Sequence, residues 1–90
     1  MPKYVIERET PGAGGATVGQ LRDGATNSNQ VIADLGPEIR WLESFVTDDK
    51  TYCVYVAEGE DIILEHARCA GIPADRVSKV ANVVDPSWGE

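Results

Sequence analysis

The sequence predicts an α+β domain whose elements follow the order β-α-β-β-α-β. Two observations carry this prediction. Four short segments are rich in the β-branched and aromatic residues that favour strands, and two longer segments repeat apolar side chains at helical spacing. Glycine, proline and aspartate separate the segments, as they do at turns and helix ends. With 90 residues, the chain is expected to form a single domain, residues 1–90, in which residues 86–90 are a tail.

The first half of the chain predicts a strand, a loop and a helix. Residues 3–9 read KYVIERE and favour the first strand, and the glycine-rich residues 10–16 favour a loop. Thr17 is followed three residues later by Gln20, a capping box that predicts the start of a helix. This helix ends before a Gly-Pro pair. One stripe at helical spacing consists of Leu21, Ala25, Ser28, Ile32 and Leu35.

The second half predicts a hairpin, a helix and a last strand. Residues 39–48 and 51–57 have strong β propensity and flank a tight polar turn, so they are expected to pair. Residues 60–70 form the second helix, which ends at Gly71, and residues 77–85 form the last strand. This order is that of the ferredoxin-like fold, a four-stranded antiparallel sheet with two helices on one face.

Charge and composition exclude several classes of function. Fifteen acidic and eight basic side chains give a net charge of −7, which disfavours nucleic acid and anionic membranes as partners. The first residues contain no long apolar run, so neither a signal peptide nor a transmembrane helix is expected. Two cysteines, Cys53 and Cys69, are too few for a disulfide framework and favour a cytoplasmic location.

Strand residues alternate between the faces of a sheet, and this alternation predicts an unusual second face. The set expected to meet the helices is Tyr4, Ile6, Leu42, Val46, Val54, Val56, Val80 and Val84. The other set is Val5, Glu7, Glu9, Trp41, Glu43, Phe45, Cys53, Tyr55, Ala81, Val83 and Asp85. Its aromatic side chains would expose a large surface, so we expect this face to pair with a second copy and to enclose a partly polar cavity. Trp41 and Phe45 would contact a small-molecule ligand there.

The single histidine, His66, is the most chemically distinctive residue. His66 and Cys69 lie three residues apart on the second predicted helix and share a face, so with Glu7 they are a candidate zinc or nickel site. An ordinary buried helix face explains the same pair. In an enzyme, His66 would be a general base, with Glu43 and Tyr55 orienting the substrate. A third interpretation is an interaction module whose second face binds another protein.

Short motifs along the chain resemble a known family. The motifs are YVIER at 4–8, the tryptophan at 41, SFVT at 44–47, DKTYCVY at 49–55, EHA at 65–67, AGIPA at 70–74 and DP at 85–86. They are similar to a small bacterial family of ferredoxin-like domains that includes an actinobacterial nickel-responsive, nickel-binding protein. The resemblance implies a ferredoxin-like dimer and nickel binding as one family activity.

The resemblance also implies where nickel ligands would stand. In the nickel-binding member, adjacent histidines directly follow the position of Val5, and further histidines stand at the positions of Ala67 and Ile72. This chain has no histidine at those positions, and its one histidine, His66, precedes Ala67. The nickel ligands are therefore not clearly retained.

These observations together predict a small cytoplasmic ligand- or metal-binding protein that is similar to the nickel-responsive family. The cofactor to test is a divalent metal, nickel or zinc, and the expected partner is a second copy of the chain. The alternative is a cofactor-independent enzyme of the monooxygenase, isomerase or dehydratase type, with His66 as the base.

Overall fold

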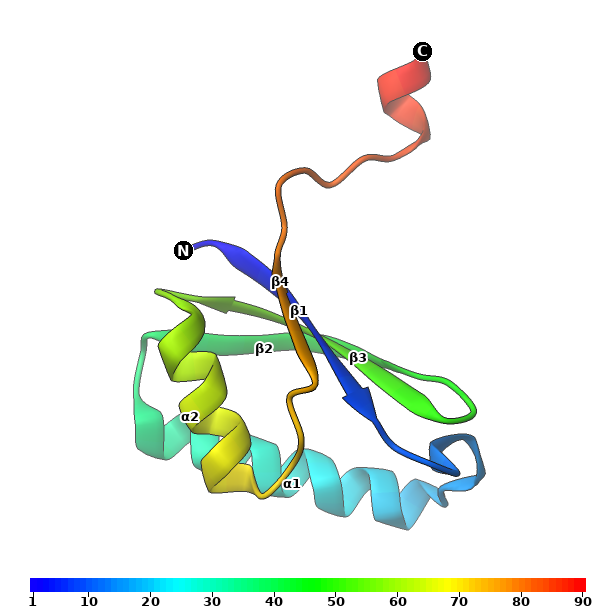
Figure 1. Ribbon diagram of the computed structural model, residues 1–90, viewed down its shortest axis with the longest axis vertical. Coiled ribbons are helices and arrows are strands. Elements are labelled where there is room, and N and C mark those ends of the chain that lie inside the picture. The colour runs from blue at the N-terminus through cyan, green and yellow to red at the C-terminus, as the bar shows by residue number, and fades with distance from the viewer.

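The computed structural model describes residues 1–90 and consists of a four-stranded sheet with two helices on one face (Figure 1). The strands are β1 (Lys3–Glu9), β2 (Ile39–Val46), β3 (Lys50–Ala57) and β4 (Arg76–Lys79). The helices are α1 (Val18–Leu35) and α2 (Glu60–Ala70), and short 3-10 turns lie at η1 (Ala13–Gly15) and η2 (Pro86–Gly89). The strand order is β2-β3-β1-β4 and every neighbouring pair is antiparallel. The predicted ferredoxin-like arrangement is confirmed.

Local signals in the sequence set the helix ends. The Thr17 hydroxyl accepts the backbone N–H of Gln20 at 3.1 Å, and the Gln20 side chain accepts the backbone N–H of Thr17 at 2.9 Å. This is the predicted capping box, which satisfies two backbone donors that the helix cannot use. α2 ends at Gly71, whose φ of 71° lies in the left-handed region that glycine adopts without a steric penalty.

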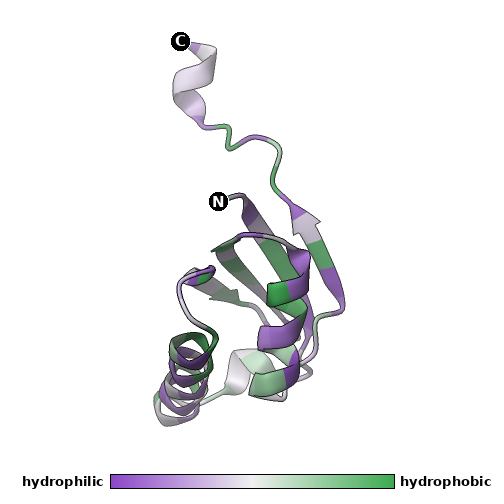
Figure 2. Cartoon of the chain, turned by 90° about the vertical axis from the view of Figure 1, so that its left-hand side faces the viewer, coloured by the Kyte–Doolittle hydropathy of each residue, from purple (hydrophilic) through white to green (hydrophobic).

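The last strand is shorter than predicted, because its partner strand ends. β4 pairs only through Arg76–Lys79, and Val80 adds one more hydrogen bond to the Lys3 carbonyl at 2.8 Å. The next residue of β1 would be Pro2, which has no N–H to continue the ladder. Residues 81–90 therefore leave the sheet and are exposed, and they run away from the domain in both views (Figures 1 and 2).

The core lies between the sheet and the helices, and the structure corrects part of the predicted face assignment. Its buried members are Tyr4, Ile6, Ile39, Cys53, Tyr55, Ala57 and Ile63. The assignment is right for β1 but wrong for β3. Tyr4 pairs with Tyr55 and Ile6 pairs with Cys53, so Cys53 and Tyr55 face the helices with them. Val54 and Val56 consequently lie on the uncovered face, which we call the open face.

In β4, Val77 pairs with Ile6 and so faces the helices, which gives Val80 the parity of the open face, and Val84 lies beyond the sheet, both contrary to the prediction. An irregularity in β2 explains the differences in that strand. The pairing register shifts between Trp41 and Glu43, so one extra residue, Leu42, stands between them. Trp41 therefore lies on the helix side of the sheet, whereas Glu43 and Phe45 lie on the open face as predicted. Leu42 is exposed, contrary to the prediction. Neither helix is long and apolar enough to cross a membrane.

Candidate ligand-binding site

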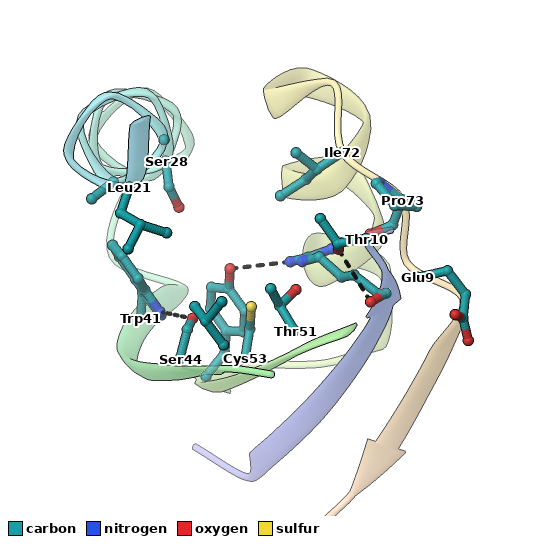
Figure 3. A pocket seen from close by; sticks show the side chains of 15 residues that line it. Glu9, Thr10, Leu21, Ser28, Trp41, Ser44, Thr51, Cys53, Ile72 and Pro73 are labelled. Carbon is teal, nitrogen blue, oxygen red and sulfur yellow. Dashed lines mark hydrogen bonds between the residues drawn. The ribbon is translucent and has the colours of Figure 1, made fainter. Parts of the chain in front are cut away.

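A cavity of about 390 Å³ lies between α1 and the helix-facing side of the sheet (Figure 3). α1 lines it with Leu21, Gly24, Ala25 and Ser28, and the segment that follows α2 adds Ile72 and Pro73 on the opposite side. The sheet forms the floor. This cavity lies within a single chain, on the face opposite to the one where the sequence predicts a cavity between two copies.

Small side chains on α1 leave this space open. Along the length of α1 only Ser28 and Val31 are buried, so the helix covers the sheet without packing tightly on it. Gly24 and Ala25 face the cavity, and a Cβ atom added at Gly24 would meet no atom within 4 Å. A helix with leucine or phenylalanine at these positions would fill the space with its own side chains.

The walls are largely apolar. Trp41 stands on the sheet floor, where its indole N–H donates to the Ser44 hydroxyl at 2.9 Å and the ring is held in one orientation. Leu21, Val46 and Ile72 provide aliphatic surface around it. A concave apolar surface with a few fixed polar groups is the usual form of a small-molecule site.

Arg8 provides the positive charge at the floor, and it is 3% exposed. One terminal nitrogen donates to the Pro73 carbonyl, and the other donates to the Tyr55 hydroxyl at 3.2 Å. The third guanidinium nitrogen, Nε, is buried and has no hydrogen-bond partner. Arg8 makes no salt bridge; the carboxylate of its neighbour Glu9 instead pairs with Lys50 Nζ at 3.3 Å.

A buried polar group of three residues lies beside the cavity on the helix side of the sheet and consists of Tyr55, Ser28 and His66. The Tyr55 and His66 rings lie 5.3 Å apart, centroid to centroid, with a tilt of 57°. His66 Nε2 and the Ser28 hydroxyl share a hydrogen bond of 3.0 Å, whereas His66 Nδ1 has no partner. Burial lowers the pKa of His66 below its ordinary 6.5, and the positive charge of Arg8 lowers it further. Burial raises the pKa of Tyr55, with Arg8 opposing the rise.

The structure brings together only part of the residues that the sequence singled out. His66 and Tyr55 are neighbours, and Trp41 and Tyr55 both line the cavity. Glu43 and Phe45, by contrast, lie on the open face and away from His66. The predicted enzyme trio of His66, Glu43 and Tyr55 is therefore not assembled within one chain.

The predicted metal ligands are also dispersed. His66 is fully buried, Cys69 is exposed and 3.4 Å from a Glu65 carboxylate oxygen, and Glu7 lies on the open face. The Glu7 carboxylate pairs there with Lys50 at 3.6 Å and with Arg76 at 3.9 Å. No group of three histidine, cysteine or acidic side chains is placed to hold a metal ion.

The sequence did not predict Arg8 as a residue of this cavity and gave Ser28 no role beyond the helix stripe. A signal for Arg8 was present, because Arg8 follows Tyr4 and Ile6 at the same strand parity. That position predicts a charge pointing toward the core, which a protein retains only where the charge has a partner or a purpose.

Similarity to known proteins identifies the family of the chain. The model of a family described as nickel responsive protein SCO4226-like matches residues 4–80. The chain belongs to the SCO4226-like family. The crystal structure of SCO4226 from Streptomyces coelicolor A3(2) has the same fold, with a TM-score of 0.77 and 17% sequence identity. The alignment covers 91% of this chain and 99% of that chain. No curated protein matches the chain.

Membership of the SCO4226-like family raises the question of nickel, and the residues present do not fit a nickel site. The chain's one histidine points between the sheet and the helices, where its Nε2 is bound to Ser28. The two other candidates, Cys69 and Glu7, lie on different sides of the fold. Imidazole, thiolate and carboxylate groups bind one ion only where they converge within about 2.0–2.3 Å of it.

We predict that the stability of the protein falls on acidification below pH 6.5 because of His66. In the unfolded chain this histidine has its ordinary pKa of 6.5, whereas the folded protein lowers it. Between the two pKa values, the unfolded chain binds a proton that the folded protein does not. The free energy of unfolding therefore decreases as the pH is lowered, by at most about 1.4 kcal/mol per pH unit, until the pH reaches the pKa of the folded state.

Urea denaturation between pH 7.5 and 5.5 measures this slope. No other histidine titrates in that window. The His66→Gln variant keeps a hydrogen-bonding side chain and is expected to lose the slope. Identical slopes for the two proteins would contradict the prediction.

Proposed function

We propose that the protein binds a small organic molecule in the cavity between α1 and the sheet. The observation that carries this proposal is the cavity itself, about 390 Å³ with apolar walls and three convergent polar side chains. These are Arg8, Ser28 and Tyr55, and the contacts of Arg8 and Ser28 with their neighbours hold them in place. Such a combination of apolar volume and fixed polar groups supports recognition of one ligand class.

The geometry favours binding over catalysis by His66. A general base must come within hydrogen-bond reach of the proton that it removes. His66 does not line the cavity, is fully buried and is separated from the cavity by Ser28 and Tyr55. We assign His66 the role of fixing the Ser28 hydroxyl, and we leave nickel out of the proposed function because the candidate ligands do not converge.

The open face supports a further part of the proposal, a homodimer. Phe45 is 53% exposed and pairs across the strands with Tyr52, so aromatic surface lies on this face. Acidic and basic side chains alternate beside it, where Lys50 contacts both Glu7 and Glu9. A face with both signs of charge can complement itself about a two-fold axis. Both cysteines are free, which supports the cytoplasmic location included in the proposal.

Filling the cavity is predicted to abolish ligand binding without unfolding the protein. The Ala25→Phe variant places an aromatic ring in the space, whereas Ala33→Phe adds the same ring to an exposed position of α1. The neutral probe N-phenyl-1-naphthylamine, whose fluorescence rises in apolar surroundings, is expected to bind the wild type saturably. Its affinity should fall by at least about tenfold in Ala25→Phe and stay unchanged in Ala33→Phe.

Two outcomes would contradict the cavity as the site. One is the absence of saturable probe binding to the wild type, and the other is equal affinity in both variants. Circular dichroism spectra of the three proteins establish that each is folded.

A charge at Phe45 is predicted to dissociate the dimer. Sedimentation equilibrium at micromolar concentration should give a dimer for the wild type and a monomer for Phe45→Lys, because moving a charged ammonium group from water into the interface is unfavourable. The control is Leu64→Lys on α2, whose original side chain is 43% exposed. That variant should remain dimeric. A monomeric wild type, or a dimeric Phe45→Lys, would refute the open face as the interface.

A further inference from the structure

We infer that the ligand of the cavity is an organic anion, a single carboxylate carried on an apolar body, and that Arg8 is its counterion. This inference rests on the proposed function and names the class of molecule that the cavity binds. Three observations carry it. They are the unpaired charge of Arg8, the free donors of its guanidinium and the apolar walls around it.

The charge of Arg8 is unpaired within the chain. Glu9 is the only acidic residue that lines the cavity, and its carboxylate is engaged by Lys50 at 3.3 Å. Arg8 itself is 3% exposed and has no carboxylate within salt-bridge distance. A buried guanidinium is unfavourable unless an opposite charge accompanies it. In a chain with a net charge of −7, burial of an unpaired cation is especially informative, since acidic partners are abundant elsewhere.

The guanidinium is also fixed and still able to donate. The Pro73 carbonyl and the Tyr55 hydroxyl each hold one terminal nitrogen, so the plane of the group is set before a ligand arrives. Of its five N–H donors, these two bonds use two, and Nε has no partner. A carboxylate matches the spacing of adjacent guanidinium donors and binds them through both oxygens.

The cavity walls indicate that the part of the ligand attached to the carboxylate is apolar. Leu21, Trp41, Val46 and Ile72 present apolar surface, which would leave a small inorganic anion poorly solvated. A cavity of about 390 Å³ accommodates an apolar body of roughly 10 to 15 non-hydrogen atoms. The Trp41 ring, held by its bond to Ser44, offers a flat surface against which an aromatic or alkyl body packs.

Ligand binding should also be visible at His66. The positive charge of Arg8 contributes to the low pKa of this histidine. An anion bound at Arg8 neutralises that contribution, so the pKa of His66 should rise on binding. A neutral ligand in the same cavity leaves the charge of Arg8 in place. Because the chain has one histidine, its imidazole proton resonances report this change without ambiguity.

The test compares two ligands of the same size and shape, 4-phenylbutyrate and 4-phenylbutanamide. Both are titrated against the wild-type protein by calorimetry and by displacement of N-phenyl-1-naphthylamine at pH 7. The carboxylate is expected to bind about 10- to 100-fold more tightly than the amide, the range of a charge-assisted hydrogen bond. NMR titration should show a raised His66 pKa in the presence of the carboxylate only.

Two variants assign the preference to Arg8. In Arg8→Met the carboxylate and the amide should bind equally, because the charge is removed and most of the side-chain volume is kept. Arg22→Met removes a charge from an exposed position of α1 and should retain the full preference. If Arg8→Met does not fold, the ligand pair and the His66 pKa of the wild type still decide the question.

Failure of the inference is distinguishable from failure of the proposed function. The inference that the ligand is an anion is wrong if the wild type binds the two ligands equally, or if it binds neither while the neutral probe still binds. Either result leaves the cavity as a binding site. If the neutral probe does not bind either, both the anionic ligand and the cavity as a binding site are contradicted.

Discussion

The burial of the Arg8 guanidinium on the helix side of the sheet is the constraint on which the rest of the site depends. Arg8 connects β1 to the segment after α2 through the Pro73 carbonyl, and to β3 through the Tyr55 hydroxyl. Its charge also favours the neutral form of His66, which shares a hydrogen bond with Ser28 of α1. One side chain thereby orders groups from strands and both helices around a single cavity.

Small residues of α1 complete the arrangement. Gly24, Ala25 and Ser28 line the cavity with small side chains and so leave volume between α1 and the sheet. A protein of this size gains stability mainly by filling its core, so an unfilled cavity beside an unpaired charge lowers stability. Such a departure from the best-packed structure is common at functional sites, where the shape serves a ligand instead of the core.

The fold could be predicted from local signals, whereas the site could not. Strand propensity, the Thr17–Gln20 capping box and Gly71 are each read over a few residues, and they set the element order and the helix ends. The cavity depends instead on strand parity and register. The extra residue at Leu42 moves Trp41 to the helix side, and the pairing of Tyr4 with Tyr55 fixes the parity of β3. Neither the bulge nor the pairing register is indicated by a local sequence motif comparable to a capping box.

The central claim is that Arg8 is kept for a ligand and not for the stability of the ligand-free protein. Chemical denaturation of Arg8→Met in ligand-free buffer tests it most directly. Pro73 is an exposed residue, and Pro73 and Tyr55 both line the cavity, so water can replace the lost donors. The account predicts a free energy of unfolding within about 1 kcal/mol of the wild type, or higher. A loss of more than about 3 kcal/mol would show that Arg8 is structural and would contradict the account.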